Sequence, residues 1–240
     1  MDSVAEQLAQ VRERIARAAT EAGRDPSSVR LLAASKTRSP ELIREAYAAG
    51  QRDFGENYVQ ELTDKAEALA DLPDIRWHMI GHLQSNKARH VVRHASAVHT
   101  VHSAKLAREL GRRAADHPVP EARRFAGDAR LVVLVEVNVG GEAQKSGCAP
   151  EEITAVLDAI DAEPALALSG FMTVPPHTDD PAGARPFFDE LVRLRDAHGG
   201  AARLPELSIG MTHDLEPAVM AGSTLVRVGT AIFGARERKE

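Results

Sequence analysis

The segment VRLLAASKT, from Val29 to Thr37, sets the expectations for the rest of the chain. Its four central apolar residues lead into a serine and a lysine, and a short apolar run bounded by polar residues is typical of a buried strand. Pro40 follows within the pattern of an amphipathic helix, so Lys36 is expected where a strand ends and a βα loop begins. Ligands bind at that edge of the sheet in α/β folds. Lys36 therefore either extends its amine to solvent or holds it in a pocket.

Strand and helix patterns alternate along all 240 residues on both sides of this segment. Such alternation implies parallel strands joined by helical crossovers. Helices are expected over residues 4–22, 40–49, 59–72, 86–95, 103–117, 150–162, within 181–200 and over 215–222. Strands are expected within residues 29–36, 51–60, 75–83, 96–103, 130–139, 166–174, 204–214 and 223–234, and a surface loop over 117–129.

Eight strand–helix units in about 240 residues fit a closed (β/α)8 TIM-type barrel of the α/β class. We expect one domain over residues 1–240, with an extra N-terminal helix over 1–23 and the barrel over 29–234. An open, doubly wound sheet is the alternative. The chain has no GxGxxG after the first strand, so the usual dinucleotide fingerprint of that alternative is missing.

Composition is that of an ordinary globular protein, with 43% hydrophobic and 27% charged residues. The formal net charge of -5 argues against a general affinity for nucleic acid. Cys148 is the single cysteine, so an intrachain disulfide is impossible, which fits a reducing compartment. The N-terminus has no signal-peptide pattern, and no apolar run reaches membrane-spanning length. We therefore expect a cytoplasmic protein with no membrane association.

The expected carboxyl ends of the strands are polar and rich in glycine. If the strands close into a barrel, these ends converge on one face, where TIM barrels bind ligands. The segments concerned are Ser35-Lys36-Thr37, Gly55-Glu56-Asn57, Gly81-His82, Asn138, Thr173, Gly210-Met211-Thr212-His213 and Arg227-Val228-Gly229-Thr230.

The last two segments have the properties of an anion site. TIM barrels often bind phosphate in the loops after strands seven and eight, through backbone N–H groups and a nearby short helix. Small residues let the backbone approach an anion, and hydroxyl groups add donors. Thr212, Gly229 and Thr230 meet these requirements, whereas Gly222 and Ser223 also suit a simple turn before a strand.

A lysine after the first strand, an arginine on the last strand and a phosphate cradle together indicate pyridoxal 5′-phosphate (PLP). The aldehyde of this cofactor would bond to the Lys36 amine as a Schiff base. Arg227 is expected to face the pyridine nitrogen, and a permanent cation cannot share a proton with that nitrogen. The ring would then be a poorer electron sink than one paired with a carboxylate.

Other chemistries find less support. His90 and His94 have the spacing of metal ligands on a helix, but the sequence has no HExxH arrangement and no evident third ligand, so no metal is expected. His99 and His102 are expected to be packing or surface residues. Ser146 and Ser169 lie outside any GxSxG elbow, so a hydrolase triad is not indicated.

The stretches AASKT, FGENYVQE, WHMIGHLQSNK, VNVGGEAQKSG, GFMTVPP and SIGMTHDLEPAVMAGSTLVRVGTAIFG run from the first strand to the last. Together they make the chain resemble the YggS/PROSC family of pyridoxal phosphate homeostasis proteins, which are similar to the barrel domain of bacterial alanine racemase. The family usually reads SMGMS where this chain reads SIGMT, and Thr212 keeps the hydroxyl at that position.

The resemblance implies a cofactor site on the carboxyl ends of the strands. Its implied residues are Lys36 for the Schiff base, Arg227 by the pyridine nitrogen, Thr212, Gly229 and Thr230 at the phosphate, and Asn57 and Met211 along the pocket.

Two functions follow from this resemblance. The first is a non-catalytic protein that holds PLP and releases it or delivers it transiently to apo-enzymes, acting as a monomer. The alternative is an amino-acid racemase, which needs an acid/base group on each face of the substrate Cα. Alanine racemase takes its second base, a tyrosine, from a separate C-terminal domain of the partner subunit. The tyrosines of this chain are Tyr47 and Tyr58, of which only Tyr58 is expected near the site, so we favour the first function.

Overall fold

The strands close into a parallel barrel in the computed structural model, which describes residues 3–142 and 146–235. Each strand pairs with the next along the chain, and β8 pairs with β1. This confirms the (β/α)8 prediction and excludes the open sheet. The strands are β1 (Arg30–Ala34), β2 (Asp53–Glu56), β3 (Arg76–Met79), β4 (Ala95–Val101), β5 (Leu131–Glu136), β6 (Leu166–Met172), β7 (Glu206–Ser208) and β8 (Leu225–Val228).

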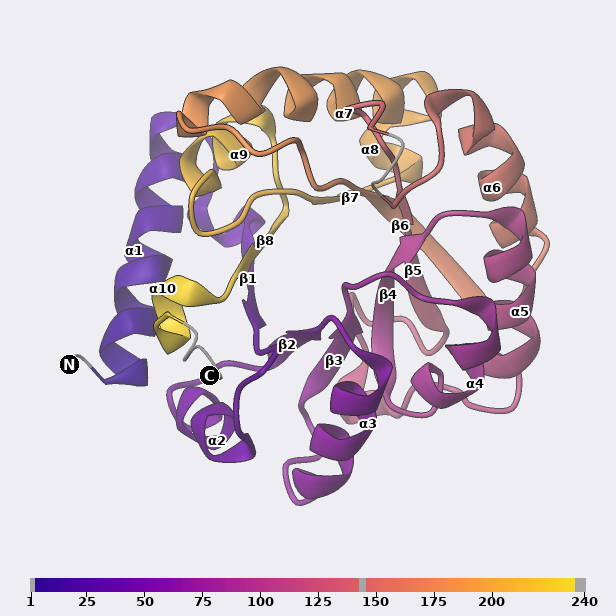
Figure 1. The fold of residues 1–240 in the computed structure, drawn as a ribbon, viewed down its shortest axis with the longest axis horizontal. Coiled ribbons are helices and arrows are strands. Elements are labelled where there is room, and N and C mark those ends of the chain that lie inside the picture. Colours follow the sequence, from indigo (N-terminus) through magenta and orange to yellow (C-terminus); the bar gives the residue numbers. More distant parts are fainter. Residues whose placement is uncertain (1–2, 143–145, 236–240) are drawn as a thin grey trace.

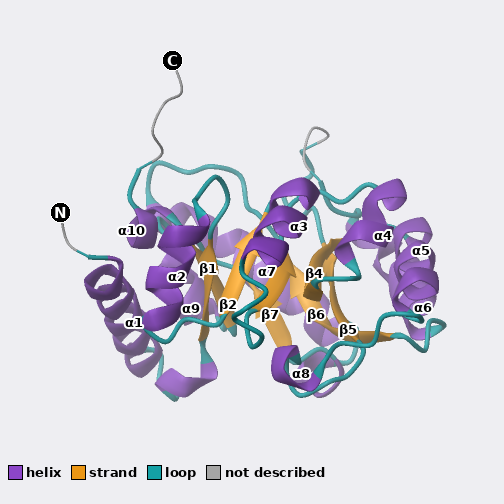
Figure 2. Ribbon diagram, turned by 90° about the horizontal axis from the view of Figure 1, so that it is seen from below, coloured by secondary structure: helices purple, strands orange, loops and turns teal. Residues whose placement is uncertain are grey.

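Helices surround the barrel as an outer ring, and the strands stand in the middle (Figures 1 and 2). The α-helices are α1 (Val4–Glu21), α2 (Pro40–Ala48), α3 (Val59–Ala68), α4 (Ala88–Val91), α5 (Ala104–Ala114), α6 (Ile153–Asp161), α7 (Arg185–Ala197), α8 (Gly200–Arg203), α9 (Leu215–Ala221) and α10 (Thr230–Phe233). Short 3₁₀ helices are η1 (Pro26–Ser28), η2 (Ser85–Lys87), η3 (Glu121–Arg123), η4 (Pro150–Glu152) and η5 (Pro181–Ala184). No helix in the described part of the chain is long and apolar enough to span a membrane.

The N-terminal helix α1 is set by its cap and its apolar stripe. Ser3 and Glu6 form a capping box, which satisfies backbone N–H groups of the first turn. Leu8, Val11 and Ile15 recur at helical spacing and are buried. The helix runs beside α9 and α10, near the last strand (Figure 1). It therefore matches the extra helix expected over residues 4–22.

The core has two parts, which the alternation of strand side chains separates. The larger part lies between the sheet and the helices and contains residues such as Phe54, Trp77 and Phe188. The smaller part fills the inside of the barrel and consists of Leu32, Ala97, Phe125, Val132, Leu134, Ala167, Met172 and Leu225, with Ile80 against it. We call these the outer core and the inner core.

The expectation of a surface loop over residues 117–129 is wrong for its central part. Phe125 is 2% exposed and belongs to the inner core. Its ring meets the His78 ring edge-to-face at 4.9 Å, and the Arg30 guanidinium lies 4.3 Å from its centroid. The loop thus places an aromatic side chain among the barrel residues, because removing an apolar ring from water lowers the free energy of the folded state.

One local expectation also needs correction, since the helix expected over 86–95 is reduced to η2 and the single turn α4. Strand β4 is buried at all of its residues, because both faces of a barrel strand are covered. Strand β8 ends at Val228, and the short helix α10 follows from Thr230.

Candidate functional site at the carboxyl ends of the strands

Lys36 lies in the turn that follows β1, and its side chain is partly buried. The next residue, Thr37, has φ of 63°, a left-handed conformation that is unfavourable for a β-branched side chain. Its backbone N–H donates to Glu61 Oε2 at 2.7 Å, which holds the turn in this conformation. The position of Lys36 is therefore imposed by neighbouring contacts rather than by local preference.

A buried ionic network underlies this turn. Lys65 Nζ donates to the Ser35 carbonyl at 2.8 Å, to Glu56 Oε1 at 2.9 Å and to Glu61 Oε2 at 2.8 Å. Ser35 Oγ donates to the same Glu56 oxygen at 2.6 Å. Burial raises the pKa of Glu56 to about 7, and the charge of Lys65 opposes that rise. The network ties the ends of β1 and β2 to α3 directly behind Lys36.

Arg227 enters the site from β8, beside β1. The register pairs Leu32 with Arg227. Its guanidinium is buried and donates to the Ser208 carbonyl, to Ser208 Oγ at 2.8 Å and to the Thr173 carbonyl at 3.0 Å. Burial lowers the pKa of Arg227 to about 10, so the side chain stays cationic at neutral pH.

Glu136, at the end of β5, is a functional candidate that the sequence reasoning missed. It is 6% exposed, and burial raises its pKa to about 7 against the opposing charge of Arg227. Its Oε2 atom is buried and has no hydrogen-bond partner among the residues that the structure describes. Sequence reasoning placed the strand end two residues later, at Asn138. The available signal was an acidic residue within the apolar run LVVLVEV, which predicts a carboxylate inside the barrel.

The phosphate-type residues lie where β7 and β8 end. Gly210 has φ of 93°, and a Cβ there would approach the Ala218 Cβ to 2.5 Å, so the turn requires glycine. A Cβ on Gly229 would lie 2.9 Å from the Ala34 carbonyl oxygen, which brings Gly229 against the end of β1. Helix α10 begins at Thr230, and the first N–H groups of a helix have no acceptor in a preceding turn. The Ile232 N–H already donates to the Gly229 carbonyl at 2.9 Å, so the candidate donors are the N–H groups of Thr230 and Ala231.

Helix α1 supports the loop that carries Met211 and Thr212. Met211 N–H donates to Asp214 Oδ1 at 2.6 Å, and Arg14 of α1 donates to the Thr212 carbonyl at 3.1 Å. Arg14 also forms an ion pair with Glu216. The N-terminal helix thus has a direct role in shaping the candidate site.

Asn57 follows β2, the neighbour of β1 in the barrel. It lines a cavity of about 490 Å³ at the rim, together with Tyr58, His82, Lys87 and His90. A Cβ on Gly81 would lie 2.1 Å from the Asn57 carbonyl oxygen, so the loops after β2 and β3 are in close contact. Asn57 is therefore a rim residue between these loops.

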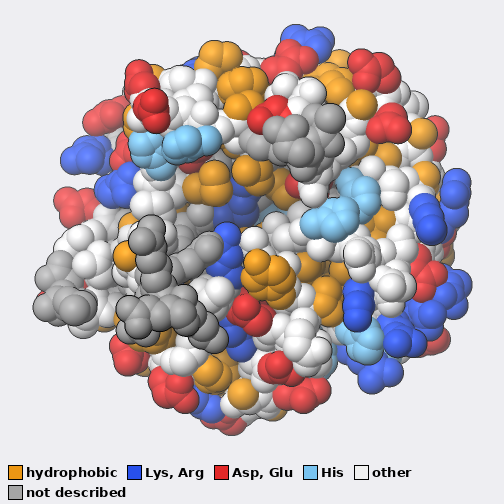
Figure 3. Space-filling view, viewed as in Figure 1, with side chains coloured by type: hydrophobic (Ala, Val, Ile, Leu, Met, Phe, Trp, Pro, Cys, Tyr) orange, Lys and Arg blue, Asp and Glu red, His pale blue; other side chains and the backbone are white. Residues whose placement is uncertain are grey.

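The face formed by the strand ends is hollowed at its middle, and Lys and Arg side chains show inside the hollow (Figure 3). Lys36 and the buried Arg227 come from the adjacent strands β1 and β8, and Met211, Thr212, Gly229 and Thr230 come from the loops beside them. The described ranges contain no group of three or more His, Cys, Asp or Glu residues that could hold a metal ion. The arrangement suits an anionic ligand that offers a group reactive toward an amine.

These features define a class: a (β/α)8 barrel with a lysine after its first strand and a buried arginine on its last. The family model "Alanine racemase, N-terminal domain" matches residues 7–237. A curated relative from Pseudomonas aeruginosa, named pyridoxal phosphate homeostasis protein, is 47% identical over 99% of this chain and 97% of its own length. The chain belongs to the pyridoxal phosphate homeostasis family, within the alanine racemase N-terminal domain fold.

Solved structures agree with this assignment. A protein of unknown function from Bifidobacterium adolescentis has a TM-score of 0.84 at 40% identity, covering 96% of this chain and 94% of its own. PipY of Synechococcus elongatus, solved with PLP bound, has a TM-score of 0.77 at 36% identity, covering 97% of this chain and all of its own. The barrel and the arrangement of its elements are thus shared with a protein that binds this cofactor.

Proposed function

We propose that this protein binds pyridoxal 5′-phosphate for intracellular PLP homeostasis, holding the cofactor on Lys36 and releasing or delivering it. The observation that carries the proposal is that a partly buried lysine follows β1 while the adjacent strand β8 carries a buried arginine and is followed by Gly229 and Thr230. The PLP-bound structure of PipY supports the identity of the ligand.

The residues present fit this cofactor. When bound, pyridoxal phosphate supplies an aldehyde that forms a C=N bond with a primary amine while water leaves. Lys36 supplies that amine, as a Schiff-base lysine. The buried and unpartnered Oε2 of Glu136 marks a position that a polar ligand group would complete.

The loops after β7 and β8 would bind the phosphate group. Backbone N–H groups at the start of α10 and the hydroxyls of Thr212 and Thr230 provide donors. Gly229 lets the backbone pass close to the end of β1. Met211 and, at the rim, Asn57 would complete the wall of the site.

Arg227 favours storage over catalysis. It donates every hydrogen bond it makes and stays cationic at neutral pH, so it stabilises an unprotonated ring nitrogen. An unprotonated ring withdraws less electron density from a bound amino acid than a protonated ring does. A protein built this way retains its cofactor without turning substrates over rapidly.

The racemase alternative requires a second base opposite Lys36. Tyr47 is engaged elsewhere, since its hydroxyl donates to Asp74 and its ring lies under the Arg52 guanidinium. Tyr58 is 59% exposed at the rim. Neither tyrosine has the buried, oriented setting of a catalytic acid/base.

We propose further that the protein acts as a cytoplasmic monomer with transient apo-enzyme partners, organised as one domain.

The test is covalent trapping of the cofactor. The protein incubated with PLP should show a visible absorption band, and borohydride reduction followed by peptide mapping should place the label on Lys36. Lys36→Ala should lose both signals, whereas Lys105→Ala, which removes an exposed lysine from α5, should keep them. A wild type that stays colourless with added PLP, or a label on another lysine, contradicts the proposal.

Catalysis is tested separately. Deuterium exchange at the Cα of L- and D-amino acids should be absent or very slow with the PLP-loaded protein. Exchange at the rates of a racemase would overturn the storage role while leaving PLP binding intact.

A further inference from the structure

A line of polar side chains crosses the inside of the barrel. Asp53 Oδ1 lies 3.0 Å from His78 Nε2, and His78 Nδ1 lies 2.9 Å from His99 Nε2. His99 Nδ1 lies 2.9 Å from Ser208 Oγ, which accepts from Arg227 Nη1 at 2.8 Å. All five residues are buried. We call this line the interior chain.

The Asp53 end sets the direction of the hydrogen bonds in the interior chain. Asp53 accepts as a carboxylate, so His78 donates to it from Nε2. A neutral His78 then accepts at Nδ1 from His99 Nε2–H, and His99, with no proton on Nδ1, accepts there from the Ser208 hydroxyl. Ser208 Oγ also accepts from Arg227, which can only donate. The arrangement that adds no charge inside the barrel therefore has both histidines as Nε2–H tautomers.

Asp53 is held as a carboxylate by its other neighbour. Arg76 donates to both of its oxygens at 2.6 Å, and the hydrogen bonds from Arg76 and His78 lower the pKa of Asp53 despite the opposing effect of burial. Burial, reinforced by the nearby positive charges of Arg227 and Arg30, keeps the pKa of His99 well below its usual range. The neutral, one-directional arrangement therefore leaves each group satisfied without adding a buried charge.

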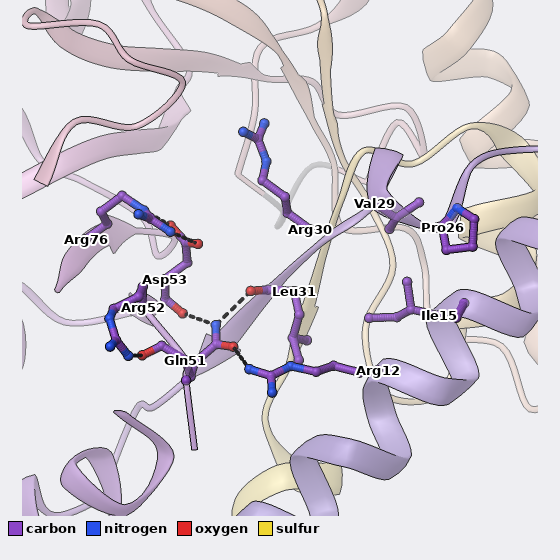
Figure 4. A pocket seen from close by; sticks show the side chains of 12 residues that line it. Arg12, Ile15, Pro26, Val29, Arg30, Leu31, Gln51, Arg52, Asp53 and Arg76 are labelled. Atoms are coloured by element: carbon purple, nitrogen blue, oxygen red, sulfur yellow. Dashed lines mark hydrogen bonds and ion pairs between the residues drawn. The ribbon is translucent and has the colours of Figure 1, made fainter. Parts of the chain in front are cut away.

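The outer end of the interior chain reaches the opposite face of the barrel. Asp53 and Arg76 line a cavity of about 430 Å³ at the amino ends of β1, β2 and β3, beside α1. Their side chains face each other at its edge (Figure 4). The interior chain thus links the Asp53–Arg76 ion pair at this face with the Arg227 guanidinium at the ligand-binding face.

We propose that His78, His99 and Ser208 are positioning residues that orient the Arg227 guanidinium toward the cofactor ring, anchored through Asp53 to Arg76. The proposal rests on the proposed function for the role of Arg227 but not for the existence of the interior chain. Ser208 accepts from Arg227 with two atoms, its carbonyl and its hydroxyl. The hydroxyl can hold that orientation only while His99 accepts its proton.

The first experiment needs no cofactor. Nitrogen-15 NMR of the imidazole groups in the cofactor-free protein reports which ring nitrogen bears the proton. His78 and His99 should both be neutral Nε2–H tautomers. A doubly protonated His78, or a proton on His99 Nδ1, would reverse the direction of the interior chain and overturn the proposal.

The second experiment breaks the interior chain at His99. His99→Leu should shift the visible band of the PLP-loaded protein and weaken PLP binding by about tenfold, the order expected if the hydrogen bond from the charged Arg227 to Ser208 Oγ is lost with it. His99→Gln presents an amide NH₂ donor group and a carbonyl acceptor, and should restore most of the affinity and the original band. This rescue keeps the test decisive if the leucine variant does not fold.

The matched control is Val98→Ala on the same strand. Val98 belongs to the outer core, so its truncation should lower thermal stability while the visible band and PLP affinity stay as in the wild type. A folded His99→Leu protein with an unchanged band and unchanged affinity refutes the positioning role. If wild type itself fails to bind PLP, the proposed function fails, and the positioning role, which presumes a bound cofactor ring, fails with it. NMR then still decides whether the interior chain exists.

Discussion

The outer core and the barrel interior differ in the kind of side chain that fills them. The outer core is a continuous apolar layer between the sheet and the helices. The interior has a small apolar cluster and, beside it, buried charged and polar groups such as Asp53, Glu136 and Arg227. Apolar contacts tolerate exchange among side chains of similar volume, whereas buried polar groups need specific partners. The outer core therefore supplies stability, and the interior supplies a defined site.

The largest expected effect tests the outer core alone. Phe188 of α7 is fully buried there, and Phe188→Ala should lower the free energy of unfolding by about 4 kcal/mol, through lost burial and the cavity left behind. Chemical denaturation measures the change. The neighbouring Phe187 is only partly buried, so Phe187→Ala should cost clearly less. Folded Phe188→Ala protein should keep the wild-type PLP band, and a shifted band would show that the two regions are not separable.

A pH effect should come from the interior. The pKa of Glu136 rises from 4.5 to about 7 on folding, so its ionisation opposes folding. That destabilising contribution is absent below pH 4.5, grows between pH 4.5 and about 7, and levels off above this range at about 3 kcal/mol. In the cofactor-free protein, Glu136→Gln should lose less stability than wild type between these pH values, as measured by thermal melts.

The control for this pH effect is the exposed carboxylate of Glu151, so Glu151→Gln should follow the wild-type pH profile. Parallel profiles for wild type and Glu136→Gln would mean that Glu136 does not carry the buried charge assigned to it.

A smaller effect tests the aromatic side chain that closes the inner core. Phe125→Leu keeps an apolar side chain but removes the ring that contacts His78 and Arg30, so about 1 kcal/mol of stability should be lost. Denaturant titration measures it. A loss as large as that of Phe188→Ala would instead indicate that leucine leaves a cavity inside the barrel.

The smallest effect is expected at the rim. Tyr58→Phe removes a hydroxyl from a side chain that is 59% exposed, so PLP affinity, visible band and stability should all stay unchanged. Spectroscopic titration with PLP provides the measurement. A clear loss of affinity would make Tyr58 part of the binding site and would reopen the racemase alternative.

Much of the fold followed from local patterns. The apolar run before Lys36 and the helices expected over residues 4–22 and 103–117 are each set by nearby residues, and the corresponding elements β1, α1 and α5 are present in the structure. Predictions failed where distant contacts decide. Phe125 was assigned to a surface loop because nothing near it in the sequence shows the barrel interior that receives it.

The candidate site divides in the same way. Lys36, Arg227, Gly229 and Thr230 stand at strand ends, where the sequence pattern of a barrel predicts ligand contacts. Their roles stay predictions until the cofactor is trapped. Glu136 and Lys65 escaped notice because a charged residue in or near a buried element is informative only once its partners are known.

By itself, then, the sequence determined the number and order of the strands, the family, and the lysine and arginine expected to meet the ligand. These are properties of periodicity and of local motif, which act over a few residues. Only the tertiary structure decided that His99 meets Ser208, 109 residues away, and that Lys65 lies behind Lys36. Such contacts exist because closure of the barrel brings distant strands together and buries their side chains, where each polar group must find a partner.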